Sequence, residues 1–497
     1  MLVERLFSGN GCTRITPPTK QRDCEERVQR VELKQTNVHR RRIFADLRRD
    51  QNRCIFQRPG VQECCLGNSA SMAARHDGKA MIAPLIRPPK FMDKDSALKT
   101  KVAVVRCGDY ELSNVMRAVE EAVGLLGGMQ RFIRPGQRVL VKPNLLSACP
   151  PEAGIDTHPA IVEAIVSLAA AAGGLCVIGD SPSTGIDTPE AYAGLLRITG
   201  MQDVIARTGA ESVRFDDAAT EREIPDAKVF RRILLTDAIA DADVLISVPK
   251  FKTHALTLMT GAVKNLYGCV PGRRKIQFHL QAGDNPGLFA QLLVNILRAV
   301  RPSLSIIDGV VGMDGQGPSA GRRRNFGLII AGADPVAVDA AACEVAGIEP
   351  TMVPMLRLAS EQGVGIADLA NIEIVGARPE EVRIPDFQLP PRGDLVNRMP
   401  KPFYRMLRNH MVPSPTFSQD ECSGCGSCVK VCPVGAISGE GNRLQADHSV
   451  CIRCYCCQEI CPREAIQLRT SRLYGILETV RKVRWKIHHF RETKASG

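Results

Sequence analysis

The sequence predicts an α/β protein with a mostly parallel sheet covered by helices, followed by a small α+β domain rich in cysteine. Two observations support this prediction. Between residues 101 and 362, short and nearly continuous apolar runs alternate with segments of helical periodicity, which is typical of strands buried on both faces of a sheet. Near the carboxyl end, two runs of four cysteines follow each other in close succession.

The alternation predicts the elements of the larger domain in chain order. Strands are expected at 101–107, 137–144, 175–180, 243–250, 303–311 and 325–332, and helices at 113–127, 159–172, 335–346 and 352–362. Thr157 is expected to cap the second helix, with Pro159 in its first turn. Asp334 and Asp339 are expected to cap and support a later helix.

Changes in composition divide the chain into five segments. A basic leader without sustained periodicity, predicted to be disordered, is followed by the α/β domain, a proline-rich linker, the cysteine-rich domain and a basic amphipathic helix. Their predicted bounds are 1–96, 97–380, 381–412, 413–470 and 471–497.

The net charge of +12 is concentrated at the two ends of the chain. Residues 1–100 carry 20 Lys and Arg against 11 Asp and Glu, and residues 401–497 carry 15 against 8, so the 300 residues between them have a net charge of −4. A general nucleic-acid binder would carry its basic charge on the folded body, so we expect no nucleic-acid partner. No apolar run reaches the roughly 18 residues of a membrane span.

The 19 cysteines occur in a long chain without a recognisable secretory leader. This combination predicts a reducing, cytoplasmic environment, in which thiolates are available for metal rather than for disulfides.

Eight of these cysteines form two runs with the spacing C-x2-C-x2-C-x3-C-P, which is that of bacterial 4Fe–4S clusters. In this pattern the first three cysteines of a run hold one cluster, and the fourth reaches the other cluster. One cluster is therefore expected on Cys422, Cys425, Cys428 and Cys461, and the other on Cys451, Cys454, Cys457 and Cys432. A zinc site is the alternative, but a zinc ion takes only four ligands, typically arranged as two pairs, whereas these two runs supply eight cysteines in two sets of four. Cys456 is out of register and is predicted to be a bystander.

Residues 415–470 thus resemble a bacterial-type dicluster ferredoxin. The resemblance implies two 4Fe–4S clusters that transfer single electrons, within a pseudo-twofold fold of two short helices and small hairpins. It also implies that apolar side chains shield the clusters from water, namely Val431, Ile437, Ile460 and Ile466.

Polar residues gather where strands of the α/β domain are expected to end. In open parallel sheets, ligands bind outside the carboxyl ends of the strands. The candidate substrate-binding residues are Lys142, Asn144, Asp180, Lys264, Asp308 and Asp314, and the candidate catalytic residues are Lys250, Lys252 and His254. Each motif also has a structural alternative, such as a solvated turn at Lys142 or a helix C-terminus at Lys264. Asp308 and Asp314 are expected in a loop that could hold a cation or hydroxyl groups.

The strings KPN, THP, GDSP, PKFKTH, GAVKNLYG, DGVVGMDGQGP and ADPVAVDAA occur in this order and resemble the domain-of-unknown-function 362 (DUF362) family over residues 101–376. This family is often fused to a dicluster ferredoxin. The resemblance implies the architecture but neither a substrate nor catalytic residues. No Walker A or GxGxxG motif is recognisable, nor is a signature of a flavin or metal relay.

These observations leave three functions open. In the first, electrons from the clusters reduce a small anionic substrate that the lysines bind, with His254 as proton donor because its ordinary pKa of about 6.5 suits proton exchange near neutrality. In the second, the protein is a non-catalytic electron carrier or docking module for a redox partner protein. In the third, the clusters are structural or sensory. The helix at 471–497 either packs on the ferredoxin domain, or contacts an acidic partner or an anionic membrane surface peripherally.

Overall fold

The computed structural model describes residues 99–182, 186, 188–272, 274–283, 285–391 and 412–471. All of them belong to one unit of the chain, residues 82–497. The predicted leader, most of the predicted linker and the predicted C-terminal helix lie outside the described residues. No helix among the described residues is long and apolar enough to cross a membrane.

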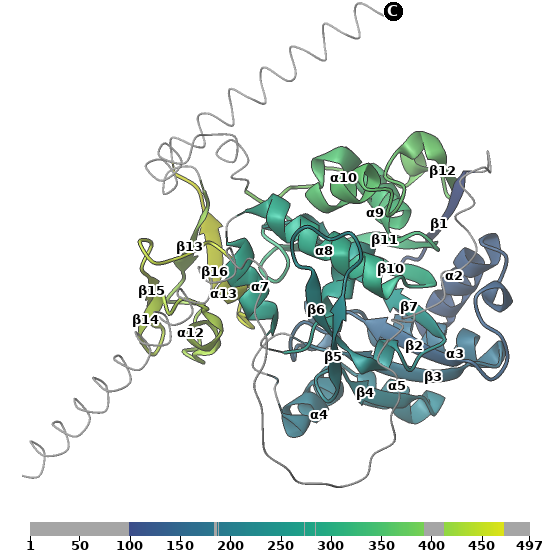
Figure 1. Cartoon of the computed structure of the whole chain (residues 1–497), viewed down its shortest axis with the longest axis horizontal. Coiled ribbons are helices and arrows are strands. Elements are labelled where there is room, and N and C mark those ends of the chain that lie inside the picture. Colours follow the sequence, from purple (N-terminus) through teal and green to yellow (C-terminus); the bar gives the residue numbers. More distant parts are fainter. Residues whose placement is uncertain are drawn as a thin grey trace, which may run out of the picture. The chain divides into compact units, whose positions relative to one another are not determined.

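A ten-stranded sheet forms the centre of the α/β domain (Figure 1). Along its main path the strand order is β12-β1-β11-β10-β7-β2-β3-β4, and β8 and β9 continue from β10. Only β11 and β9 run antiparallel to their neighbours. The strands are β1 Thr100–Arg106, β2 Arg138–Pro143, β3 Leu175–Asp180, β4 Glu211–Arg214, β7 Val244–Val248, β8 Lys250–His254, β9 Leu258–Thr260, β10 Leu304–Asp314, β11 Arg322–Gly332 and β12 Ile372–Gly376.

Helices cover both faces of the sheet, because successive strand residues point to opposite faces. In β1, Ala103 and Val105 join one apolar core, whereas Val102 and Val104 join the other. In Figure 1, α9 and α10 lie above the sheet and α2 and α3 to its right. The first core contains α2 Leu112–Leu125, α3 Pro159–Ala171, α4 Pro189–Ile198 and α5 Met201–Thr208, and the second contains α6 Ala262–Asn265, α7 Arg274–Ala282, α8 Pro286–Val300, α9 Pro335–Val345 and α10 Pro354–Glu361.

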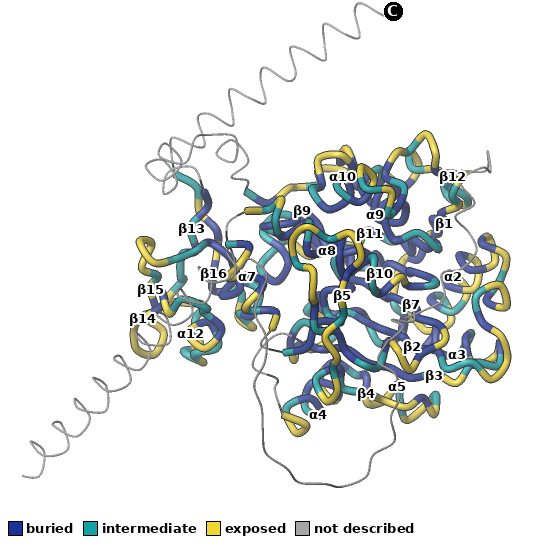
Figure 2. The backbone as a smooth tube through the Cα atoms, in the orientation of Figure 1, coloured by how far each residue is buried: buried dark blue, intermediate teal, exposed yellow. Residues whose placement is uncertain are grey.

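The burial of the strands explains why the sequence predicted them. All five residues of β7 are buried, and so are ten of the eleven residues of β10. Figure 2 shows the buried residues along the strands and the exposed ones on outer helices and loops. The mostly parallel α/β fold is therefore confirmed. The sequence did not predict β4, β12, α4, α5, α7, α8, the short strands β8 and β9, or the hairpin of β5 Ala219–Glu223 and β6 Arg232–Thr236. The alternative of a helix C-terminus at Lys264 agrees with α6, which ends at Asn265.

Short 3-10 helices connect several of these elements. They are η1 Met129–Arg131, η2 Pro151–Ala153, η3 Asp237–Ile239, η4 Leu266–Cys269, η5 Pro350–Met352, η6 Leu369–Asn371 and η7 Pro379–Glu381. Beyond η7, Val382 and Ile384 are buried in the α/β core, so the first residues of the predicted linker pack as part of this domain.

Two local predictions are wrong. The cap of α3 is His158, whose Nδ1 accepts a hydrogen bond from the Ala160 N–H, and not Thr157. The Thr157 hydroxyl is engaged elsewhere, since it accepts from Asn144 N–H and donates to the Val248 carbonyl. Asp314 lies on strand β10 and not in a loop, because this strand continues past the predicted end at residue 311, and Asp308 lies within the part that was predicted as a strand.

Other local predictions are confirmed. Pro159 stands at the start of α3, and Asp334 caps α9 by accepting from the N–H groups of Val336 and Ala337. Asp339 supports a different helix: its carboxylate accepts from Ala262 N–H at 2.6 Å and Val263 N–H at 3.0 Å, at the N-terminus of α6.

The cysteine-rich module has two small antiparallel pairs and two short helices, as the ferredoxin resemblance implied. Strand β13 pairs with β16, and β14 pairs with β15. The elements are β13 Ser414–Phe417, α12 Ser427–Val431, β14 Ile437–Glu440, β15 Arg443–Ala446, α13 Cys456–Glu459 and β16 Ile466–Arg469.

Candidate functional site

A cavity lies outside the carboxyl ends of β2 and β3, where ligands bind in open α/β sheets. It encloses about 770 Å³ of empty space, part of which is open to solvent. Four lysines line it, Lys142, Lys250, Lys264 and Lys275, together with Asn144, Asp180 and His279. Its remaining wall comes from the cysteine-rich module through Val431, Cys456, Glu459 and Ile460.

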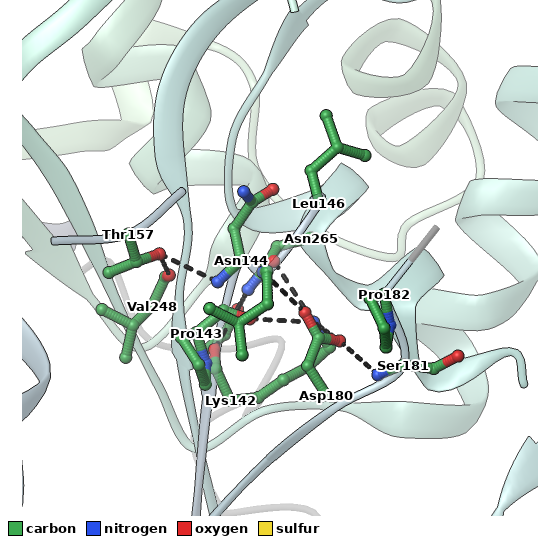
Figure 3. Close-up of polar contacts among 12 residues, drawn as sticks. Lys142, Pro143, Asn144, Leu146, Thr157, Asp180, Ser181, Pro182, Val248 and Asn265 are labelled. Atoms are coloured by element: carbon green, nitrogen blue, oxygen red, sulfur yellow. Dashed lines mark hydrogen bonds and ion pairs between the residues drawn. The ribbon is translucent and has the colours of Figure 1, made fainter. Parts of the chain in front are cut away.

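Lys142 and Asp180 form a buried ion pair at the base of the cavity, with Nζ and Oδ1 2.7 Å apart (Figure 3). Lys142 Nζ also donates to Asn265 Oδ1 at 3.3 Å, and Asp180 Oδ2 accepts from Leu145 N–H at 2.9 Å. Gly268 makes this pair possible, since a Cβ there would lie 2.3 Å from Asp180 Oδ1. The charge of Lys142 is therefore balanced within the protein.

Lys250 is balanced in a similar way. Its Nζ lies 2.8 Å from Asp308 Oδ2 and donates to the Tyr110 hydroxyl at 2.6 Å. Burial, and then the charge of Asp308, raise the pKa of Tyr110, so the phenol keeps its proton and donates it to Asp308 Oδ1. The ring of His158 stacks on Tyr110, and the His158 N–H also donates to Asp308. This network fixes Lys250 at the cavity wall.

Lys275, which sequence reasoning missed, is the third lysine with a full set of partners. Its Nζ donates to the Ser181 carbonyl and hydroxyl at 2.7 and 2.6 Å and to the Pro182 carbonyl at 2.9 Å. Burial lowers its pKa to about 8, against the opposing charges of Asp180 and Asp216. Lys275 belongs to α7 and does not follow a strand of the predicted sheet. The search for polar residues at the carboxyl ends of strands could therefore not find it.

Lys264 differs from the other three lysines. Within the described part of the chain, no oxygen accepts a hydrogen bond from its Nζ. Burial lowers the pKa of Lys264, while the nearby charges of Glu459 and the Cys456 thiol oppose this shift. Both of these neighbours belong to α13 of the cysteine-rich module. Lys264 is thus the cavity cation with the most capacity to bind an anion.

His254 does not line the cavity but contacts Glu459, which does. Its Nδ1 accepts hydrogen bonds from the N–H groups of Leu256 and Thr257, so the proton of the neutral ring is on Nε2. Nε2 lies 2.8 Å from Glu459 Oε1. Burial lowers the pKa of His254 to about 4, which favours the neutral ring.

The structure places the remaining candidates away from the cavity. Lys252 Nζ donates to the Ile155 carbonyl at 2.6 Å, and burial lowers its pKa to about 7 although the nearby Asp156 opposes this. Asp314 is 2.9 Å from both Arg322 and Arg324, so its charge is already matched. Asp308 does not line the cavity and affects it only through its ion pair with Lys250. The cavity therefore brings together Lys142, Asn144, Asp180, Lys250 and Lys264, but not Lys252, His254, Asp308 or Asp314.

The thiols of the cysteine-rich module gather into two groups of four. We call Cys422, Cys425, Cys428 and Cys461 the outer quartet, and Cys432, Cys451, Cys454 and Cys457 the inner quartet. In the outer quartet, burial raises the pKa of Cys428 to about 11, and the other three thiols add to the shift. In the inner quartet, burial raises the pKa of Cys457 and the other three thiols contribute, as does Cys428 of the outer quartet.

Both quartets fit the ligand set of a 4Fe–4S cubane. All eight thiols are free of disulfide bonds. Backbone N–H groups point at three of the sulfurs, from Gly424 to Cys422, from Ala436 to Cys432 and from Ala465 to Cys461. Such hydrogen bonds favour sulfur that carries negative charge. No group of the described residues is arranged to bind a single metal ion, and a cavity lies instead between the inner thiols.

Cys456 is buried between the two cavities and lines both of them. Sequence reasoning had no ground to select it, because it lies outside the cluster spacing. The outer quartet has a different environment, since Cys425 is exposed. Within residues 82–497, the module is held by the loop after β10: Gln458 Nε2 donates to the Gln316 carbonyl, and Ser319 Oγ donates to the Glu459 carbonyl.

Comparisons with known proteins agree with these two parts. A model of a domain of unknown function (DUF362) matches residues 139–344, and a model of a 4Fe–4S binding domain matches residues 415–438. The thylakoid-associated protein sll1697 of Synechocystis sp. (strain ATCC 27184 / PCC 6803 / Kazusa) is 33% identical over 294 residues, which cover 58% of this chain and 87% of that protein.

Among solved structures, the lactate racemase apoprotein from Thermoanaerobacterium thermosaccharolyticum aligns with a TM-score of 0.33 and 13% identity, over 51% of this chain and 58% of that one. The extensive match to the cyanobacterial relative and the two domain matches lead to the same assignment. The chain belongs to the DUF362 family and carries a 4Fe–4S binding domain at its carboxyl end.

Proposed function

We propose that this protein is an iron–sulfur oxidoreductase that holds two 4Fe–4S clusters and passes electrons to a small anionic substrate in the α/β cavity. The observation that carries the proposal is the position of Cys456. Its side chain separates the cavity from the inner quartet, and the next residue, Cys457, belongs to that quartet. An electron would therefore have to cross only a thin layer of protein.

When bound, the clusters would supply one-electron transfer at low potential. The outer quartet would hold the cluster that receives electrons, because Cys425 is exposed to a partner protein. The inner quartet would hold the cluster that delivers them, because Cys454 and Cys457 are buried beside the cavity. Ile437 and Ile466 pack among thiols of both quartets, and Val431 and Ile460 pack beside Cys454, so apolar side chains shield the inner thiols from water, whereas Cys425 stays exposed.

The cavity favours an anion such as a carboxylate or phosphate. Lys142 and Lys250 are fixed by their acidic partners and would orient the substrate, whereas Lys264 would provide the main attraction. Asn144 lies at the same wall and can still accept a hydrogen bond through its side-chain oxygen, whereas the amide of Asn265 is engaged by Lys142 and Ser247. A concave site outside the ends of parallel strands, with charged and polar side chains that converge on it, is a usual place for a small molecule to bind.

His254 would act through Glu459 rather than on the substrate directly. Its Nε2 holds a proton toward Glu459 Oε1, and the Glu459 side chain lines the cavity. The predicted role of His254 as proton donor is thereby changed to that of a positioning residue behind Glu459. Lys252 would keep the loop at Ile155 in place through its hydrogen bond.

The test starts with anaerobic purification and measurement of iron, which should reach about eight atoms per chain for two clusters. Small carboxylates and phosphates are then screened by thermal shift, because a ligand of the native state raises stability by mass action. A hit should reoxidise the dithionite-reduced clusters, and Lys264→Met should abolish this reoxidation while the cluster spectrum stays intact. Ligand-independent reoxidation, or about four irons, would contradict the proposal.

The alternative is an electron carrier or docking module, which the exposure of Cys425 also favours. A carrier would reduce a partner protein equally well with Lys264→Met. The relative described as thylakoid-associated is consistent with a peripheral membrane contact of residues 471–497. The cytoplasmic location and the redox partner itself stay predictions.

A further inference from the structure

Lys264 lines the anion cavity beside Cys456, which also borders the inner quartet. It belongs to α6, whose N-terminus is supported by Asp339, and it lines the cavity together with Cys456 and Glu459. Cys456 in turn lines the cavity among the inner thiols. The ammonium group of Lys264 thus faces the place where a substrate anion would bind, and a single residue, Cys456, stands between it and the place where a cluster would change its charge.

The charges of the other three lysines around the cavity are already matched. Lys142 has Asp180 at 2.7 Å, Lys250 has Asp308 at 2.8 Å, and Lys275 has three oxygen acceptors. Glu459 lies 2.8 Å from the neutral ring of His254, so its charge is not neutralised there and acts on Lys264. Among the described residues, Lys264 forms no ion pair within 4.0 Å, so its field acts on whatever occupies the two neighbouring sites.

We infer that Lys264 couples anion binding in the cavity to the reduction state of the cluster held by Cys432, Cys451, Cys454 and Cys457. This inference rests on the proposed function. An anion bound at Lys264 neutralises its charge, so the inner cluster becomes harder to reduce. Conversely, the electron that reaches the inner cluster adds negative charge beside Lys264 and weakens anion binding.

The two effects are equal by thermodynamic linkage. If the oxidised protein binds an anion tenfold more tightly than the reduced protein, the saturating anion lowers the potential of the inner cluster by about 59 mV for one electron. A change of this order is reasonable, because charges separated by a few ångströms of buried protein are poorly screened. The consequence would be a protein that binds its substrate when oxidised and releases the product anion more readily when reduced.

The experiment is an anaerobic redox titration with dithionite, followed by electron paramagnetic resonance, with and without inorganic phosphate or acetate. We expect the potential of one cluster to fall by tens of millivolts at saturating anion, while the other potential stays constant. Lys264→Met should lower the same potential without anion and remove the anion effect, and Lys264→Arg should keep the effect. The control is Lys430→Met, which removes an exposed charge of the cysteine-rich module that does not line the cavity and should leave the anion effect intact.

The outcomes separate the inference from the proposed function. Phosphate or acetate that binds the oxidised protein by calorimetry, but shifts neither potential, would overturn the coupling and leave the oxidoreductase proposal standing. An anion effect that persists in Lys264→Met would assign the coupling to another residue and would also overturn the inference. Iron for only one cluster, or no binding of either anion, would remove the basis of both proposals.

Discussion

His254 and Glu459 join the two domains of the protein through a buried contact of 2.8 Å between Nε2 and Oε1. His254 ends strand β8 of the large sheet, and Glu459 ends the short helix α13 of the cysteine-rich module. Because the two N–H groups bonded to Nδ1 fix the tautomer, the ring can present only its Nε2 proton to the module. The contact therefore specifies the position of α13 at the cavity wall.

We expect Glu459→Ala to lower the stability of the protein by about 1–3 kcal/mol, because it removes the carboxylate that lies 2.8 Å from the buried Nε2 of His254. Glu459→Gln should cost less, since its amide oxygen can occupy the same place. Thermal unfolding at constant iron content is the measurement, with the exposed Glu440→Ala as control. Equal melting temperatures for Glu459→Ala and the unaltered protein would show that the contact contributes nothing.

Gly268→Ala should break the ion pair at the base of the cavity. The added Cβ would lie 2.3 Å from Asp180 Oδ1 and 2.5 Å from Lys142 Nζ, so one charge must move away from the other. Breaking a buried pair costs about 3–5 kcal/mol. Gly124→Ala is the matched control: a Cβ there, within α2, would meet no atom within 4 Å. Denaturant unfolding should show a large loss for Gly268→Ala and no loss for Gly124→Ala.

The buried carboxyl of Asp339 should make the free energy of unfolding depend on pH. Burial raises the pKa of this carboxyl from 3.8 to about 7, although the N–H groups of Val263 and Ala262 oppose the change. A carboxyl whose folded pKa is raised contributes stability that is fully present below the unfolded pKa and is lost as pH rises through the folded value. The free energy of unfolding should therefore fall between about pH 4 and pH 7, by at most roughly 1.4 kcal/mol for each step of one pH unit.

Asp339→Asn cannot titrate and should remove this part of the pH dependence while keeping one acceptor for the N-terminus of α6. Asp339→Ala should lose about 1–2 kcal/mol near pH 4, because both N–H groups of the helix lose their acceptor, and this loss should shrink as pH rises because the variant cannot titrate. Unfolding free energies measured from pH 4 to pH 8 test both statements. A slope in Asp339→Asn identical to that of the unaltered protein would show that another group causes the dependence.

The division of the eight thiols into two quartets predicts how much iron each Cys→Ser variant retains. Cys428→Ser and Cys461→Ser should lose the same cluster, although the two residues belong to different cysteine runs, because their thiols lie in one group. Cys457→Ser should lose the other cluster. Each variant should keep roughly four irons of eight, and the resonance spectrum shows which cluster remains. Cys456→Ser should keep both, which is the control for the adjacent position.

A Cys461→Ser spectrum that matched Cys457→Ser rather than Cys428→Ser would show that each run holds its own cluster. That result would overturn the assignment of both quartets, since the fourth cysteine of each run defines them.

The local elements and the residue types of the site could be predicted from the amino-acid sequence alone. The alternation of apolar runs and helices predicted a sheet buried on both faces, because a strand that is buried on both faces, such as β7, consists of consecutive and mostly apolar residues. The cysteine spacing predicted the grouping of Cys428 with Cys461, because a cubane requires short loops of fixed length. The rule for strand ends found Lys142, Asp180 and Lys250, since each follows a strand that the sequence shows.

Which charges are free, and what closes the cavity, depended on the packing of the folded chain. Asp314 is matched by two arginines of the neighbouring strand, and the Thr157 hydroxyl is taken by two backbone groups, so neither is available for its predicted role. Lys275, Cys456 and Glu459 reach the cavity from segments that carry no strand-end signal. Their roles depend on contacts between residues far apart in the chain, and such contacts leave no periodicity in the sequence from which they could be predicted.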